Sequence, residues 1–182
     1  MVWMVKRMKL TEREHFDTVY HIFEQSFIPG ELRPYDKMKD LWLQKKFKIY
    51  QYEKQGNIVG GLSLWEFDDF IYIENFAVKE EMRGYGIGGR MIDYIQSLYA
   101  AQLLVLEVDK PVDKISQQRI AFYQRHHWIY NHYHYIQPNL RSNSPIIHLM
   151  IMSYPTPLDD DLFTKIKLQI FQQVYNVNKR GK

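Results

Sequence analysis

The chain has 182 residues, no cysteine and a formal net charge of +3. This length is enough for one well-buried domain, and the lack of cysteine excludes disulfides and thiolate zinc sites. We recognise no signal peptide and no apolar run of membrane-spanning length, so we expect a soluble, cytoplasmic protein. The charge is too weak and too dispersed to favour nucleic acid, and we expect no membrane partner.

The first part of the chain predicts two helices and a meander of strands. Thr11 and Glu14 have the spacing of a capping box, and apolar residues recur behind them at helical spacing. A loop broken by proline and glycine leads to a second helix, and Gly56-Asn57 is expected to form the turn of a hairpin. The expected elements are a strand at 2–8, helices at 11–27 and 36–44, and strands at 46–53, 58–67 and 71–78.

The stretch from Phe70 to Leu98 joins an apolar strand, a short charged turn, a glycine cluster and a helix expected at 86–98. The first turn of such a helix leaves backbone N–H groups without acceptors, and the helix dipole places partial positive charge at the same end. Glycines allow the backbone to approach a pyrophosphate closely, and Arg83 adds a cation. The stretch therefore predicts a phosphate-binding site.

Two known patterns fit these glycines. The spacing Gly84-x-Gly86-x-x-Gly89 matches the dinucleotide fingerprint, with Glu107 or Asp109 about where the ribose-binding acid falls. That interpretation predicts a nicotinamide-dependent oxidoreductase. A dinucleotide fold, however, normally turns from strand into glycines almost at once, whereas a charged turn separates Val78 from the glycines here. The dinucleotide pattern therefore fits this stretch less well than the second pattern, Arg83-x-x-Gly86-x-Gly88.

The second part of the chain predicts a central strand and further elements behind it. The run 103–108 is almost continuously apolar, and the order strand, helix, strand favours a right-handed crossover. A helix at 116–125, a hairpin of strands at 128–136 and 146–154, and a helix at 158–175 follow. We expect one domain at 1–156 and a C-terminal segment, 157–182, that packs on this domain or on a partner subunit.

The pattern Arg83-x-x-Gly86-x-Gly88 resembles the pyrophosphate loop of the GNAT superfamily, the acyl-CoA-dependent N-acetyltransferases. Leu106-Glu107-Val108 and the later Phe122-Tyr123 pair resemble two further motifs of that superfamily. The chain departs from the pattern where His127 and Trp128 replace a Gly-Phe pair and where Ser116 replaces an asparagine.

This resemblance implies an α/β GNAT fold, a mixed central sheet of about seven strands flanked by helices. It also implies acetyl-CoA as the co-substrate, bound by the end of the strand at 71–78, by the glycine loop and by the helix that carries the aromatic pair. The cofactor contacts expected from the resemblance are Phe76, Ala77, Val78, Arg83, Gly84, Tyr85, Gly86, Ile87, Gly88, Gly89, Arg90, Ser116 and Phe122.

Acetyl transfer from a thioester to an amine needs a proton acceptor for the amine, donors for the oxyanion and a proton donor for the thiolate. The resemblance assigns the oxyanion to backbone N–H groups at 76–78 and thiolate protonation to Tyr123. Strand alternation makes Glu74 the expected proton acceptor, directly or through water. Some superfamily members carry this glutamate at the position of Tyr72, and Glu107 is the alternative.

The resemblance also implies that the loop between the first two helices covers the acceptor side. Glu31, Arg33 and Tyr35 are therefore expected to contact the substrate, together with Glu107, although ordinary solvated loop residues would look the same. Four histidines suggest metal ligands, but no third ligand at motif spacing is evident, and we expect no metal site. These histidines are His126, His127, His132 and His134.

The function expected is direct transfer of an acetyl group from acetyl-CoA to a primary amine, because no cysteine is present to carry the acyl group. The acceptor is expected to be a small molecule or a peptide amine. A catalytically inactive CoA-binding regulatory or interaction module is the alternative. A homodimer through the last hairpin or helix is common among proteins of this type and is a further hypothesis.

Overall fold

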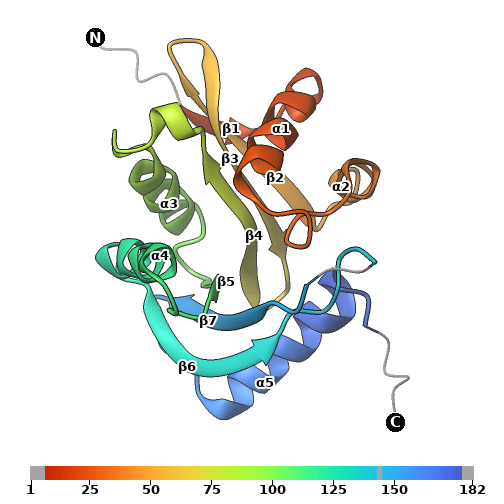
Figure 1. Cartoon of the computed structure of the whole chain (residues 1–182), viewed down its shortest axis with the longest axis vertical. Helices are drawn as coiled ribbons and strands as arrows, with labels where there is room; N and C mark the ends of the chain where they lie inside the picture. The colour runs from red at the N-terminus through yellow and green to blue at the C-terminus, as the bar shows by residue number, and fades with distance from the viewer. Residues whose placement is uncertain (1–6, 143–144, 178–182) are drawn as a thin grey trace. The chain divides into compact units, whose positions relative to one another are not determined.

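The computed structural model describes residues 7–142 and 145–177. Within them the chain forms seven β-strands, five α-helices and three short 3-10 or π-helical turns (Figure 1). The predicted α/β class, with about seven strands and flanking helices, is confirmed. The chain divides into two compact units, Met1–Gln102 and Leu103–Lys182.

Four antiparallel strands form the sheet of the first unit, in the order β1 (Met8–Leu10), β2 (Phe47–Lys54), β3 (Asn57–Glu66) and β4 (Phe70–Val78). Of the first strand predicted at 2–8, residues 2–6 lie outside the described residues. The hairpin turn predicted at Gly56-Asn57 is wrong by one residue. Asn57 already pairs with Lys54, so Gln55 and Gly56 form the turn.

The helical elements of this unit are η1 (Arg13–His15), α1 (Phe16–Ser26), α2 (Tyr35–Trp42), η2 (Glu80–Met82) and α3 (Ile87–Leu98). The predicted capping box of Thr11 and Glu14 is wrong. The N–H of Thr11 donates to the carbonyl of Ile49 over 2.8 Å, so the chain is still paired with β2 at this point. The helix begins only after a 3-10 turn, which has no side-chain cap.

The helices α1 and α3 cover opposite faces of this sheet (Figure 1). A Cβ built on Gly60 would lie 2.7 Å from the sulfur of Met91 in α3, and one built on Gly61 would lie 2.6 Å from Val19 in α1. Neighbouring residues of a strand point to opposite faces, so one helix lies against each face. The absence of side chains at two consecutive positions lets both helices approach the backbone of β3 closely.

The inner face predicted for α3 is largely confirmed. Met91, Ile92 and Ile95 are fully buried. Leu98, expected on the same face, is 47% exposed, and that part of the prediction is wrong. Tyr99 takes the inward position four residues after Ile95, and its hydroxyl donates to Glu66 over 2.7 Å.

Three antiparallel strands form the sheet of the second unit, with β7 (His148–Tyr154) between β5 (Leu103–Asp109) and β6 (Ile129–Ile136). The helix α4 (Lys114–Arg125) connects β5 to β6. The C-terminal helix α5 (Asp160–Gln169) continues into a π-helical turn, η3 (Ile170–Val174). This helix packs on β6, since the ring of Phe163 stacks on Tyr133 with centroids 4.2 Å apart.

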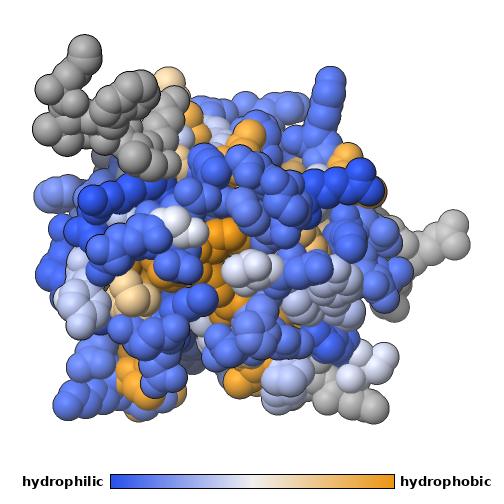
Figure 2. Space-filling model, turned by 90° about the horizontal axis from the view of Figure 1, so that it is seen from above, coloured by the Kyte–Doolittle hydropathy of each residue, from blue (hydrophilic) through white to orange (hydrophobic). Residues whose placement is uncertain are grey.

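The face of the molecule seen in Figure 2 is mainly polar. In Figure 2, hydrophilic residues cover most of the face shown and surround smaller hydrophobic areas. None of the helices within residues 7–142 and 145–177 has both the length and the apolar character needed to cross a membrane.

Candidate active site

The strand β4 carries a β-bulge at Glu74. Ser63 of β3 faces Asn75, whereas the next residue of β3, Leu64, faces Ile73, so Glu74 has no Cα partner in β3. The hydroxyl of Ser63 donates to Oδ1 of Asn75 over 2.9 Å and fixes the register beside the bulge. A bulge re-aims the extra side chain, so Glu74 departs from the regular ladder.

Two donors hold the carboxylate of Glu74. Nε of Arg33 lies 2.8 Å from Oε1, and the indole N–H of Trp65 donates to Oε2 over 2.6 Å. The side chains of Arg33 and Glu74 are only 8% and 5% exposed, so this is a buried ion pair. The guanidinium carbon of Arg33 also lies 5.8 Å from the centre of the Trp65 ring. The predicted proton acceptor is thus a fixed carboxylate whose two oxygens both accept hydrogen bonds.

The three polar residues predicted on the loop between α1 and α2 lie in different environments. Arg33 reaches Glu74, and its carbonyl accepts a hydrogen bond of 2.9 Å from Tyr20 in α1. Tyr35 begins α2 and donates to Asp17 over 2.5 Å. Glu31 is half-buried in the loop. Only Arg33 is therefore shown in contact with a predicted catalytic residue.

The predicted oxyanion residues form the end of β4. Phe76 is half-buried, whereas Ala77 and Val78 are buried. The carbonyl of Val78 accepts a hydrogen bond of 3.1 Å from Nε of Arg83, which ties the start of the glycine loop to the strand.

The glycine loop ends in a helix start that lacks a side-chain cap. Gly86 is the N-cap of α3 with a φ of +71°, a left-handed conformation that favours glycine. No side chain caps the first turn, and this turn contains no acidic residue. A helix start of this kind suits an anion, and the phosphate site itself stays a prediction. The expected loop contacts lie together in this segment: Arg83, Gly84, Tyr85, Gly86, Ile87, Gly88, Gly89 and Arg90.

Arg90 joins the glycine loop to β2. Its Nε donates to the hydroxyl of Tyr52 over 3.0 Å, and its terminal nitrogen donates to the carbonyl of Tyr85 over 2.9 Å. Burial alone would raise the pKa of Tyr52, but hydrogen bonds from Arg90 and Arg7 bring this pKa below its ordinary value. The ammonium of Lys54 lies 4.9 Å from the centre of the exposed Tyr85 ring. Three cationic side chains therefore lie on or beside this loop, counting Arg83.

In the second unit, Tyr123 of α4 lies within an aromatic cluster. Its ring meets those of Phe122 and Trp128 edge-on, with centroids 5.2 Å and 5.9 Å apart. Burial raises the pKa of Tyr123 above its ordinary value, partly opposed by the charge of Arg119. The phenol therefore keeps its proton at neutral pH, which is the state that a general acid needs.

Ser116, predicted as a cofactor contact, forms the cap of α4. Its backbone N–H and its hydroxyl both donate to Oδ1 of Asp113 over 2.8 Å, and its hydroxyl accepts from the N–H of Asp113 over 3.2 Å. This reciprocal arrangement is a capping box. The hydrogen bonds from Ser116 lower the pKa of Asp113.

Glu107, predicted as a substrate contact, lies in β5 and accepts hydrogen bonds from two tyrosines. Tyr135 of β6 donates to Oε1, and Tyr175, just after η3, donates to Oε2 over 2.7 Å. Sequence reasoning missed both tyrosines, as it missed Trp65 beside Glu74. These partners are separated along the chain by between 9 and 68 residues, and no local pattern signals such pairings.

Two of the four histidines named in the sequence analysis have other ring partners. His134 meets His148 of β7 instead, with Nε2 and Nδ1 2.9 Å apart, while the ring of His132 packs edge-on against Tyr130. Within residues 7–142 and 145–177, the group of three side chains close enough to share a cation is Glu12, Glu14 and His15, with both glutamates exposed. The absence of a metal from the function stays a prediction.

Sequence comparison places this arrangement among known proteins. The model of the acetyltransferase (GNAT) family matches residues 16–128. The putative acetyltransferase YjbC of Bacillus subtilis is 29% identical over 104 residues, which are 54% of this chain and 53% of that protein. The chain thus spans about half the length of this curated relative.

Solved structures extend the likeness over most of the chain. A putative acetyltransferase of the GNAT family from Bacteroides thetaiotaomicron matches with a TM-score of 0.86 and 25% identity, over 94% of this chain and 99% of that one. An aminoglycoside 6'-N-acetyltransferase complexed with coenzyme A matches with a TM-score of 0.62 and 12% identity, over 83% and 99% respectively, which is a likeness of fold alone. The predicted GNAT fold is confirmed, and the chain belongs to the acetyltransferase (GNAT) family.

Proposed function

We propose that this acetyltransferase moves an acetyl group from acetyl-CoA to a primary amine by direct transfer. The observation that carries the proposal is the uncapped start of α3 behind the left-handed Gly86, with Arg83 and Arg90 beside it. Backbone N–H groups, a helix dipole and two guanidinium groups suit the pyrophosphate of CoA. The CoA complex of a protein with the same fold supports this choice.

The chemical roles follow the demands of acetyl transfer. Tyr123, kept protonated by burial, gives a proton to the leaving thiolate of CoA. Glu74 takes the proton of the acceptor amine, directly or through water, while Arg33 and Trp65 hold its carboxylate in place. Backbone N–H groups at 76–78 stabilise the oxyanion. The acceptor is a small molecule or a peptide with a primary amine, with contacts proposed from Glu31 and Tyr35.

The binding half of this proposal is tested by thermal unfolding with acetyl-CoA. At a ligand concentration of 100 times Kd, linkage stabilises the fold by about 2.7 kcal/mol, which for a chain of this size raises Tm by roughly 5–11 °C. Gly86→Glu is expected to abolish the shift, because it places a carboxylate at the phosphate site and a Cβ 3.2 Å from Arg90. Gly56→Glu is the matched control, since this hairpin glycine also has a positive φ, +76°, and open space around it.

The transfer half is tested with a panel of primary amines: a diamine, an amino acid, an aminoglycoside and a peptide with a free N-terminus. Release of CoA that depends on one of these amines is the expected result. If acetyl-CoA does not raise Tm in the binding test, the whole proposal is wrong. A normal shift without acetylation of any amine would instead favour a CoA-binding regulatory module, which the engagement of both oxygens of Glu74 also favours.

A further inference from the structure

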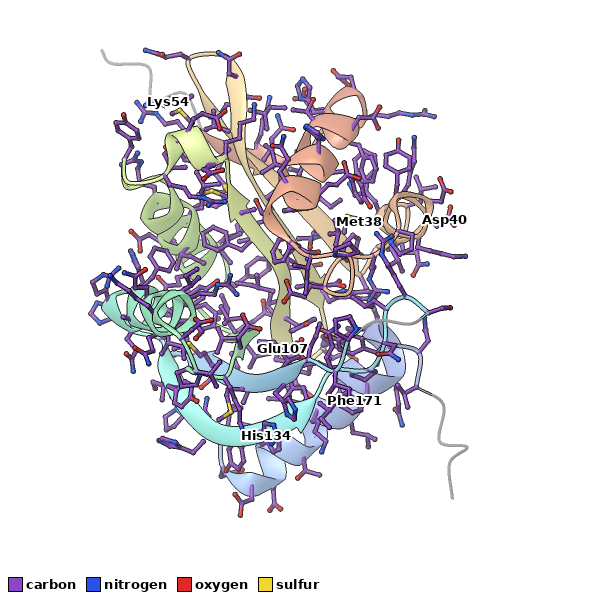
Figure 3. All side chains as sticks on the ribbon, viewed as in Figure 1. Met38, Asp40, Lys54, Glu107, His134 and Phe171 are labelled. Carbon is purple, nitrogen blue, oxygen red and sulfur yellow. The ribbon has the colours of Figure 1, made fainter. Side chains whose placement is uncertain are left out.

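His134 of β6 and His148 of β7 form a pair of imidazole rings in the second unit. Nε2 of His134 lies 2.9 Å from Nδ1 of His148, and one ring donates its N–H to the other. The ring planes are 13° from parallel and the ring centres are 5.1 Å apart, so the two nitrogens face each other along the line between the rings. Both residues are exposed, and water therefore reaches the pair. Figure 3 labels His134 on β6.

Strand pairing brings the two histidines together. His148 pairs with Ile136, two residues after His134, so the histidines are diagonal neighbours on one face of adjacent antiparallel strands. Tyr135 points to the opposite face, where its ring meets Phe171 of the C-terminal segment edge-on. The C-terminal segment therefore packs on the other face of β6 and leaves the histidine pair accessible.

The pair has the chemistry of two metal ligands. Imidazole nitrogen is a ligand that Cu²⁺, Ni²⁺ and Zn²⁺ bind well. Two nitrogens at about 2.0–2.1 Å from one ion lie about 2.8–3.0 Å apart at a right angle and about 3.3–3.4 Å apart at the tetrahedral angle. The observed distance of 2.9 Å between the two nitrogens matches the right angle. Neighbouring ligands of a square-planar ion meet at this angle, and this is a geometry of Cu²⁺ and Ni²⁺.

We propose that His134 and His148 bind a divalent transition-metal ion, Ni²⁺ or Cu²⁺ in preference to Zn²⁺, with water as the remaining ligands. The ring that donates the hydrogen bond moves this proton to its other nitrogen, so both facing nitrogens offer a lone pair and both rings stay neutral. The exposed rings turn to direct these lone pairs at the ion. The bound ion links β6 to β7. This inference goes beyond the proposed function and does not depend on it.

One neighbouring charge opposes the ion. Lys110 follows β5, its backbone N–H donates to the carbonyl of His148 over 3.3 Å, and its positive charge acts on His134. Lys110→Gln removes the charge and keeps the backbone hydrogen bond. This variant should therefore lower the Kd for Ni²⁺ about two- to fivefold, which is the effect of one exposed charge.

The test is a calorimetric titration of the untagged, full-length protein with NiCl₂ at neutral pH. One equivalent of Ni²⁺ should bind to the wild-type protein, and saturating Ni²⁺ should raise Tm by about 5 °C or more. His134→Gln and His148→Gln should each raise the Kd at least about tenfold, because even the loss of an outer-shell partner of a metal costs that much. MgCl₂ should not bind to the pair, since Mg²⁺ prefers oxygen ligands.

His132→Gln is the matched control. His132 is an exposed histidine of the same strand, but it lies in the register shift between Asn131 and His134, and its ring packs against Tyr130. This variant should keep the Kd of the wild-type protein. The inference is overturned if the wild-type protein binds no Ni²⁺, if His134→Gln or Lys110→Gln leaves the Kd unchanged, or if His132→Gln weakens binding as much as His134→Gln. The proposed function is unaffected by these outcomes, because its own tests use acetyl-CoA and amines.

Discussion

The ion pair of Arg33 and Glu74 gives the sharpest stability prediction. Its atoms are 2.8 Å apart and both side chains are more than nine-tenths buried, so at an effective dielectric constant of 20 the attraction is about 6 kcal/mol before desolvation. Replacing Arg33 by Gln leaves the carboxylate of Glu74 buried without its cation. We expect the free energy of unfolding to fall by about 3–5 kcal/mol.

Urea denaturation at pH 7 measures this loss, with Arg119→Gln as the control. Arg119 and Asp109 form an ion pair of 2.7 Å whose side chains are 44% and 34% exposed, so the control should lose at most about 1 kcal/mol. The double variant Arg33→Gln, Glu74→Gln removes the unpaired charge of Glu74 as well. It should recover part of the lost free energy of unfolding. A loss below about 1 kcal/mol in Arg33→Gln would refute the reasoning, because it would mean that water screens the pair.

Three further predictions concern other parts of the chain. Tyr123→Phe should lower kcat at least tenfold with little change in the Kd of acetyl-CoA, measured by titration calorimetry; an unchanged kcat would remove the general-acid role. Gly61→Ala should cost about 1–3 kcal/mol in urea denaturation, because its Cβ would lie 2.6 Å from the side chain of Val19, and the additional variant Val19→Ala should lessen that cost. Burial, with Lys110 and His148, lowers the pKa of His134. The unfolded chain therefore binds more protons, so stability should fall as pH drops below about 6.5, and less so in His134→Gln.

The elements of the fold were predictable because their signals are local. Helical spacing predicted α3, and turn chemistry predicted β2 and β3, each to within one residue at either end. Thr11 shows the limit of this reasoning, since its spacing to Glu14 fits a capping box but strand pairing with Ile49 takes precedence. Local patterns are weak where tertiary contacts compete for the same backbone groups.

The partners in the site were not predictable for a related reason. Glu74 and Glu107 were selected from the sequence, but Arg33 reaches Glu74 across 41 residues and Tyr175 reaches Glu107 across 68. The bulge that re-aims Glu74 depends on the register between two strands, and the turn that directs Tyr175 depends on one extra residue in a helix. Neither the bulge nor the π-helical turn produces a periodic pattern in the sequence.

The bulge in β4 also makes the length of this strand matter. Ser63 and Asn75 pair on one side of it and Leu64 and Ile73 on the other, so a chain lacking Glu74 would keep both pairs and form a regular ladder. A deletion of a paired residue of β4 would instead shift the register by one and exchange the two faces of the strand. Relatives that keep this sheet should therefore tolerate a deletion at position 74 better than a deletion at a paired position of β4.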